Sequence, residues 1–228
     1  MAPSDIANPN NWDAYRERAA AFAKGRKVGA VSGVGSTARA AKPLVTWLLS
    51  WLASHPEVHS MVEASSGHWP SGWQAHVRWP GLNYTGVDIV REQVEANAAF
   101  VTRRGAASFG LHHAEFLHGS MIREPLPTAD LLLTKDTLIH FSLADITTFL
   151  HLSVLGRCPR FRYVLFVQEQ PMELGLTKNV EISRNGHHAL DFALPPFSLN
   201  VSTVFVYPSG RCCKKSVQLL DLTTSACP

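Results

Sequence analysis

The feature that most constrains the fold is a regular alternation of short apolar runs with helical patterns after residue 57. The clearest run is T-A-D-L-L-L-T-K, Thr128–Lys135, which predicts a buried strand. Further strands are predicted over residues 58–64, 82–89, 109–116 and 162–168, with helices over 71–78, 90–103 and 143–152. Strands that alternate with helices indicate an α/β fold with a doubly wound, mostly parallel sheet.

The two ends of the chain differ from this alternation. Two β-rich runs, 199–207 and 215–222, are joined by P-S-G-R-C-C, which predicts an antiparallel hairpin at one sheet edge and brings the strands to seven. At the other end, helical patterns over 11–24 and 40–54 predict two helices that pack over the core domain. We therefore expect an N-terminal helical extension over 1–56 and a core domain over 57–228.

The composition fits a folded domain and bears on which classes of binding partner are indicated. The chain has 228 residues, of which 46% are hydrophobic and 17% charged, and its formal net charge is +3. No long run of Lys and Arg concentrates this charge, so nucleic acid is permitted as a partner but not indicated. The oligomeric state has no signature in the sequence.

Cysteines and apolar segments predict the cellular setting. The four cysteines (Cys158, Cys212, Cys213 and Cys227) form no C-x-x-C pair, which makes both a zinc site and a disulfide framework poor interpretations. The N-terminus has no basic and apolar signal pattern, and the longest apolar segment, 43–53, is too short to span a bilayer. We therefore expect a soluble protein of the reducing cytoplasm, without membrane contact.

The segment M-V-E-A-S-S-G-H-W-P-S-G-W, residues 61–73, joins the first predicted strand to a turn of small residues. Asp88 follows Gly67 by 21 residues, at the end of the second predicted strand, where a carboxylate can bind a ribose diol. A strand-end acid that caps the next helix is the alternative for Asp88 alone. Because Ser65 and Pro70 replace residues of a pyrophosphate-binding turn, a nicotinamide oxidoreductase is disfavoured, and a Walker A loop is absent.

Three segments resemble motifs of class I S-adenosylmethionine-dependent methyltransferases, which have a Rossmann-like fold. They are V-E-A-S-S-G-H-W, then Y-T-G-V-D-I-V, and then L-P-T-A-D-L-L-L-T-K-D-T-L-I-H-F. The later segment N-G-H-H-A-L-D-F-A-L-P-P-F and the loop G-V-G-S are also similar to parts of a subgroup of that family. The resemblance extends over about residues 33–222 and implies S-adenosylmethionine as the cofactor.

The resemblance also implies roles for the residues of the first two motifs. Glu63 matches the acid that orients the cofactor's amino group, and Gly67 the glycine over which the methionine part passes. Asp88 matches the ribose-binding acid, and Ile89 the apolar residue beside adenine. Trp69 is a further candidate cofactor contact, with a core residue that closes the first turn as its alternative.

Further along the chain, Ser120 and Met121 match the position that binds the adenine amine, and Asp136 and His140 match residues beside the transferred methyl group. Asp136 is thus a candidate for both cofactor binding and catalysis, and His140 is a candidate base. The structural alternatives are that Asp136 caps a helix and that His140 is a packing residue.

The chain departs from the family pattern at two positions. Ser65 stands where the family usually has glycine and is also a predicted cofactor contact, and Ser120 stands where it often has aspartate. These departures leave two functions open: a methyltransferase that acts on an unidentified acceptor, and a catalytically silent methyltransferase-like binding or interaction module. A roofed pocket favours a small molecule as acceptor. The 11 histidines are scattered, and no metal site is predicted.

Overall fold

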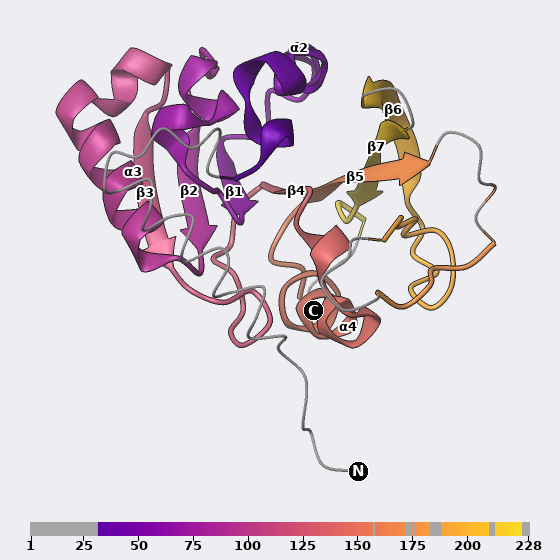
Figure 1. Ribbon diagram of the computed structural model, residues 1–228. Coiled ribbons are helices and arrows are strands. Elements are labelled where there is room, and N and C mark those ends of the chain that lie inside the picture. Colours follow the sequence, from indigo (N-terminus) through magenta and orange to yellow (C-terminus); the bar gives the residue numbers. More distant parts are fainter. Residues whose placement is uncertain are drawn as a thin grey trace. The chain divides into compact units, whose positions relative to one another are not determined.

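The structure is a computed structural model that describes residues 32–156, 158–171, 175, 177–182, 188–209 and 213–224 (Figure 1). The helix predicted over 11–24 lies outside these residues. The chain divides into two compact units, Asp13–Ser120 and, in the main, Met121–Pro228, which are described separately below. The predicted boundary between residues 56 and 57 stays a prediction.

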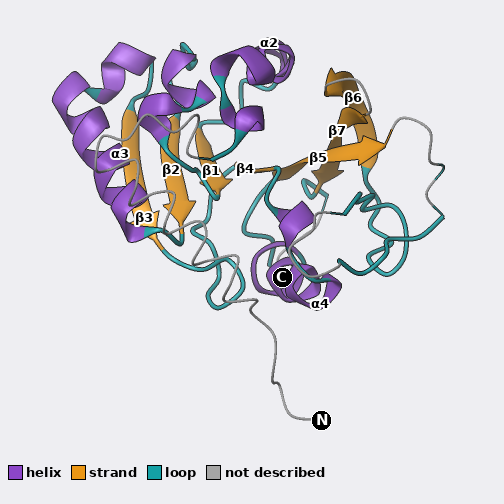
Figure 2. Ribbon diagram, viewed as in Figure 1, coloured by secondary structure: helices purple, strands orange, loops and turns teal. Residues whose placement is uncertain are grey.

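The strands form a mixed sheet of seven, in the order β3-β2-β1-β4-β5-β7-β6 (Figure 2). The bounds are β1 Ser60–Ala64, β2 Asn83–Asp88, β3 His113–His118, β4 Leu131–Lys135, β5 Tyr163–Pro171, β6 Ser202–Ser209 and β7 Cys213–Asp221. Strands β1 to β3 run parallel to one another, as do β4 and β5, whereas β7 is antiparallel to β5 and to β6. The predicted α/β fold with a C-terminal antiparallel hairpin is therefore confirmed.

In the first unit, α2 (Ala38–Ser54) begins at Thr37, whose hydroxyl accepts a hydrogen bond from the amide of Ala40. This is a standard N-cap, because the side-chain oxygen satisfies an amide that lacks an intrahelical partner. The apolar face of α2 is buried and comprises Ala41, Leu44, Leu48, Trp51 and Leu52. The helix predicted over 40–54 is thus confirmed.

Helix α3 (Arg91–Arg104) follows β2 and packs on β2 and β3 (Figure 1). The helix predicted over 71–78 is wrong: the chain forms two 3-10 turns, Trp69–Ser71 and Trp73–His76, because Pro70 and Gly72 interrupt helical hydrogen bonding. The third strand begins at residue 113, later than predicted. Gly110 has φ +77 and lies against the backbone of Trp79, where a Cβ would be 2.2 Å from a carbonyl oxygen, so the strand starts only after this turn.

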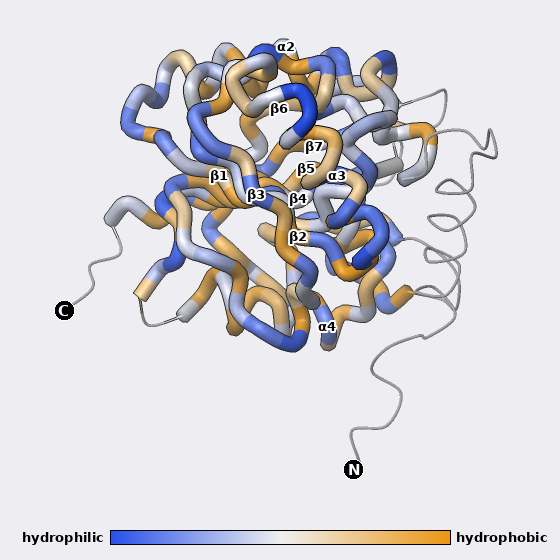
Figure 3. The backbone as a smooth tube through the Cα atoms, turned by 90° about the vertical axis from the view of Figure 1, so that its left-hand side faces the viewer, coloured by the Kyte–Doolittle hydropathy of each residue, from blue (hydrophilic) through white to orange (hydrophobic). Residues whose placement is uncertain are grey.

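The second unit is organised around β4, whose five residues are all buried. The strand has the sequence L-L-L-T-K, and Figure 3 colours the backbone by hydropathy. Helix α4 (Leu143–Phe149) starts at Ser142, whose hydroxyl accepts from the amide of Asp145, and continues into a π-helical turn, Leu150–Val154. This element corresponds to the helix predicted over 143–152.

The expectation about the cysteines is wrong for the two that the structure describes. Cys158 and Cys213 are both disulfide-bonded. Disulfides persist mainly in oxidising compartments, so the cysteines do not support a reducing location, and the cytoplasm stays a prediction. Among the described helices, none has both the length and the apolar character needed to cross a bilayer.

Candidate functional site

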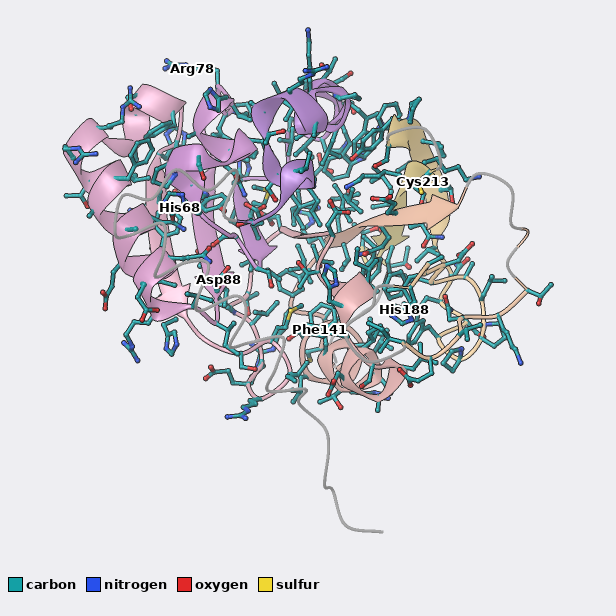
Figure 4. All side chains as sticks on the ribbon, in the orientation of Figure 1. His68, Arg78, Asp88, Phe141, His188 and Cys213 are labelled. Carbon is teal, nitrogen blue, oxygen red and sulfur yellow. The ribbon has the colours of Figure 1, made fainter. Side chains whose placement is uncertain are left out.

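The turn after β1 is joined to the end of β2 by a carboxylate. The amide of Gly67 donates to Asp88 Oδ2 at 2.9 Å, and the amide of Val90 donates to Asp88 Oδ1 at 2.9 Å. Burial raises the pKa of Asp88, while the hydrogen bonds from Val90 and Gly67 lower it. Asp88, labelled in Figure 4, therefore has a fixed position beside the turn, whereas α3 has Val90 as its N-cap and no side-chain cap. The amide of Ile89 also hydrogen-bonds to this carboxylate, which can accept about four hydrogen bonds and so has capacity for a further donor.

Asn97 on α3 holds the same turn from the other side. Its amide group donates to the carbonyl of Gly67 at 2.7 Å, and its carbonyl accepts from the amide of Trp69 at 2.8 Å. Asn97 is fully buried. Sequence reasoning missed this residue, although it lies at helical spacing between Val94 and Val101, where an apolar side chain is expected. A polar residue on that face is a signal that the helix binds backbone groups.

Glu63 is buried at the carboxyl end of β1, and both of its oxygens have protein partners. Gln74 donates to Oε1 at 2.8 Å and Tyr84 donates to Oε2 at 2.5 Å. Burial, followed by the charge of Glu63, raises the pKa of Tyr84, so its hydroxyl stays protonated as a donor. Gln74 also donates to the carbonyl of Ser66 at 2.9 Å, which ties Glu63 to the turn. The predicted contact of Glu63 with a cofactor's amino group stays a prediction.

Trp69 lies at the centre of an aromatic core. Its indole nitrogen donates to the hydroxyl of Tyr84 at 3.0 Å, and its ring makes edge contacts with Tyr84, Phe109 and Phe116. The side chain is fully buried. These contacts match the core alternative for Trp69, and its role as a cofactor contact stays a prediction.

Two residues of the turn have left-handed backbones. Ser65 has φ 60 and Gly67 has φ +62. A serine in this region costs roughly 1–2 kcal/mol relative to its ordinary conformations. Ser32, which precedes the G-V-G-S loop, accepts a hydrogen bond from the amide of His68 at 3.2 Å, and a Cβ on Gly67 would lie 2.5 Å from its Oγ. The glycine is therefore required by both its backbone and its neighbour.

The three remaining predicted cofactor contacts follow the ends of β2 and β3. Ile89 is half-buried, and Met121 is buried. The amide of Gly119 donates to the carbonyl of Asp88 at 3.0 Å, so the segment that leads to Ser120 runs beside Asp88 within the first unit. The geometry therefore brings Ser65, Gly67, Asp88 and the approach to Ser120 together.

In the second unit, Asp136 directly follows β4 and carries a buried ion-pair cluster. Its φ is 54, and its Oδ2 accepts from Lys135 at 2.5 Å and from Lys215. Burial raises the pKa of Asp136, but the two ammonium groups outweigh it and lower the pKa overall. Asp136 is therefore ionised at neutral pH and is a weak base in that state.

His140 closes the 3-10 turn Leu138–His140 that follows Asp136, and its amide donates to the carbonyl of Thr137 at 3.0 Å. The residue is half-buried. The amide of His188 donates to the carbonyl of Ile139 at 3.1 Å, which places His188 beside this turn. Within the residues described here, no cluster of His, Cys, Asp and Glu is arranged to hold a metal ion.

Comparison with known proteins gives the class of fold. The chain has the fold of class I S-adenosylmethionine-dependent methyltransferases, as solved structures of low sequence identity show. One is magnesium protoporphyrin IX methyltransferase (ChlM) from Synechocystis PCC 6803 with bound SAH, at a TM-score of 0.54 and 15% identity over 93% of this chain and 94% of that one. Another is the N-terminal domain of EvdMO1 with SAH bound. It has a TM-score of 0.53 and 12% sequence identity, over 78% of this chain and 80% of that one.

The mitomycin 7-O-methyltransferase MmcR is similar at a TM-score of 0.50 and 16% identity, over 92% of this chain and 68% of that one. No protein-family model matches the sequence. No curated protein matches it either. The likeness is thus one of fold.

Proposed function

We propose that this protein is an S-adenosylmethionine-dependent methyltransferase that acts on a small molecule. The single observation that supports this most strongly is the hydrogen bond from Gly67 to Asp88, because it joins a left-handed glycine turn to a strand-end carboxylate. That pairing presents backbone beside an acid that can accept ribose hydroxyls, as nucleoside-binding α/β folds require. The fold neighbours ChlM and EvdMO1, whose structures contain SAH, add support.

In this proposal the first unit holds the cofactor. Asp88 accepts the ribose hydroxyls, and the methionine part passes over Gly67 beside Ser65. Glu63, already fixed by Tyr84 and Gln74, contributes through the turn that it stabilises and through its negative charge near the amino group. Ile89, Ser120 and Met121 form the adenine side. Bound S-adenosylmethionine would supply a sulfonium methyl group as the electrophile.

Asp136 and His140 are proposed to serve the acceptor. Because ligands of doubly wound sheets bind at the carboxyl ends of the strands, the position of Asp136 after β4 suits a role there. Its lowered pKa favours hydrogen bonding over proton removal in the resting enzyme, so Asp136 orients the acceptor. His140 is proposed to carry the released proton, a role that an imidazole side chain can fill.

A catalytically silent module is the second candidate, and the conformation of Ser65 favours it. At φ 60 its Cβ stands where a glycine is usual, next to the predicted path of the cofactor. Calorimetry with S-adenosylmethionine and S-adenosylhomocysteine separates the two candidates. Binding at micromolar ligand supports the enzyme, and the absence of heat at millimolar ligand removes it.

A further inference from the structure

The G-V-G-S loop, residues 33–36, belongs to the first unit and is closed by its own hydrogen bonds. The amide of Ser36 donates to the carbonyl of Gly33 at 3.1 Å, and the Ser36 hydroxyl donates to the carbonyl of Ser32 at 3.0 Å. Thr37, directly after the loop, caps α2. Ser32 is therefore fixed at the start of a closed loop that continues into a helix.

The side chain of Ser32 lies against the turn that follows β1. Its Oγ accepts a 3.2 Å hydrogen bond from the amide of His68, which is labelled in Figure 4. A Cβ built on Gly67 would lie 2.5 Å from this Oγ and 3.2 Å from the Cβ of Ser32. Because packed atoms do not approach so closely, the Ser32 hydroxyl occupies the space directly beside the Cα of Gly67.

The backbone groups of the turn are already bound, whereas the Ser32 hydroxyl has a hydrogen to donate. The amide of Gly67 donates to Asp88, and its carbonyl accepts from Asn97. The amide of His68 donates to Ser32. A hydroxyl that accepts one hydrogen bond retains its own hydrogen as a donor, and among the described residues this hydrogen has no acceptor. A ligand that lies beside Gly67 therefore meets a hydroxyl donor.

The charges of the first unit indicate which ligand group would accept from that donor. Glu63 and Asp88 are buried carboxylates of β1 and β2. In contrast, α2, which follows the Ser32 loop, carries two exposed basic residues, Arg39 and Lys42, and no acid. The ammonium group of an amino acid is attracted by the acids, and its carboxylate by the basic residues. A carboxylate also matches the hydroxyl donor, since an ionised carboxylate only accepts hydrogen bonds.

Resting on the methyltransferase function proposed above, we propose that Ser32 is a further cofactor-binding residue. Its hydroxyl donates to the carboxylate of the cofactor's methionine part, while its oxygen continues to accept from the amide of His68. Ser32 thus recognises the amino-acid tail and has no role toward the adenosine part. The closed loop holds the hydroxyl in place before the ligand binds, which limits the entropy lost on binding.

Binding of two ligands by the full chain tests this role. S-adenosylhomocysteine has the amino-acid tail, whereas 5′-methylthioadenosine has the same nucleoside and sulfur without it. In titration calorimetry, Ser32→Ala should bind S-adenosylhomocysteine roughly tenfold more weakly than the unchanged protein, as the loss of a hydrogen bond to a charged group predicts. Its affinity for 5′-methylthioadenosine should stay the same. Ser108→Ala removes an exposed hydroxyl elsewhere in the unit and should alter neither affinity.

A third ligand identifies the carboxylate as the group that is bound. S-adenosyl-3-thiopropylamine is S-adenosylhomocysteine without its carboxylate, so the unchanged protein should bind it roughly tenfold more weakly than S-adenosylhomocysteine. Ser32→Ala should cause no further loss for this ligand. Equal affinity of the unchanged protein for the two ligands would overturn the inference, even if Ser32→Ala did not fold.

Three other results would also reject the role of Ser32. An equal loss of affinity for all three ligands in Ser32→Ala would show that the hydroxyl only supports the turn through His68. An unchanged affinity for S-adenosylhomocysteine would show that the tail does not reach the hydroxyl. A higher affinity would show that the side chain obstructs the tail.

The two proposals fail in different ways. If the unchanged protein binds neither S-adenosylhomocysteine nor 5′-methylthioadenosine, the methyltransferase function is contradicted, and the role of Ser32 with it. If the protein binds both ligands and Ser32→Ala does not distinguish them, the methyltransferase function stands and only the role of Ser32 is lost.

Discussion

The amide of Gly67 donates a 2.9 Å hydrogen bond to the carboxylate of Asp88, across 21 residues of sequence. The link fixes the first turn of the sheet against the end of its neighbouring strand. If Asp88 also accepts ribose hydroxyls, Asp88→Ala should weaken S-adenosylhomocysteine binding roughly 10- to 100-fold, as the loss of charge-assisted hydrogen bonds predicts. Titration calorimetry measures this. Glu115→Ala, which removes an exposed acid from β3, is the control and should change nothing.

A substitution at Ser65 should strengthen the site, whereas Asp88→Ala should weaken it. Because its φ of 60 suits glycine, Ser65→Gly should raise the free energy of unfolding by about 1 kcal/mol in urea denaturation. Removal of the Cβ should also strengthen cofactor binding if it crowds the ligand. Gly33→Ala places a Cβ at another left-handed position with no atom within 4 Å, and it should be destabilising through the backbone alone. Weaker binding in Ser65→Gly would refute the crowding argument.

Replacement of Asn97, an uncharged residue, should lower the stability of the fold considerably. Asn97→Ala leaves the carbonyl of Gly67 and the amide of Trp69 buried without partners, which should cost roughly 2–4 kcal/mol in unfolding experiments. Asn97→Asp keeps the acceptor for Trp69 but places a buried carboxylate oxygen against the carbonyl of Gly67, so a loss at least as large as in Asn97→Ala is expected. Asn83→Ala, an exposed change at the start of β2, is the matched control. A loss in Asn97→Ala no greater than in that control would contradict the two-sided clamp.

The Asp136 cluster predicts a pH dependence. Since the folded protein lowers the pKa of Asp136 below its ordinary 3.8, the ionised carboxylate stabilises the fold above that pH. This contribution is lost as the pH falls from about 4 through the lower folded pKa. Asp136→Asn, whose amide side chain tolerates a positive φ, should cost about 3 kcal/mol near pH 7 and progressively less below pH 4. Denaturation at several pH values measures the difference.

The double variant Asp136→Asn, Lys215→Met tests the cause of that loss. Removal of one uncompensated ammonium group should restore part of the stability, which a double-mutant cycle reports as a coupling energy. Strictly additive losses would show that Lys215 and Asp136 do not interact.

The sequence predicted the parts of the fold that depend on local pattern. The L-L-L-T-K run became β4, and the helix over 40–54 became α2, because burial and amphipathic spacing both act within a few residues. The third strand was displaced because its start depends on the contact between Gly110 and the backbone of Trp79, which is about thirty residues away. Such contacts leave no periodic signal.

The sequence predicted the acidic residues of the candidate site, but it did not predict most of the residues that hydrogen-bond to them. The spacing of Gly67 and Asp88 predicted that both belong to one site, and the structure joins them by a hydrogen bond that the sequence pattern did not predict. The sequence did not indicate that Glu63 is bound by Tyr84 and Gln74, or that Lys215 reaches Asp136 from a strand 79 residues away. Partners brought together by tertiary folding carry no sequence spacing from which to infer them.

The turn around Gly67 has a consequence for the energetics of ligand binding. Its carbonyl is bound by Asn97 and its amide by Asp88, so the turn is ordered while the protein folds. A ligand that docks there meets a preorganised surface and loses little affinity to the ordering of loops. Complex formation should therefore be a single fast step, and the amides of Gly67 and Trp69 should exchange slowly with deuterium before any ligand arrives.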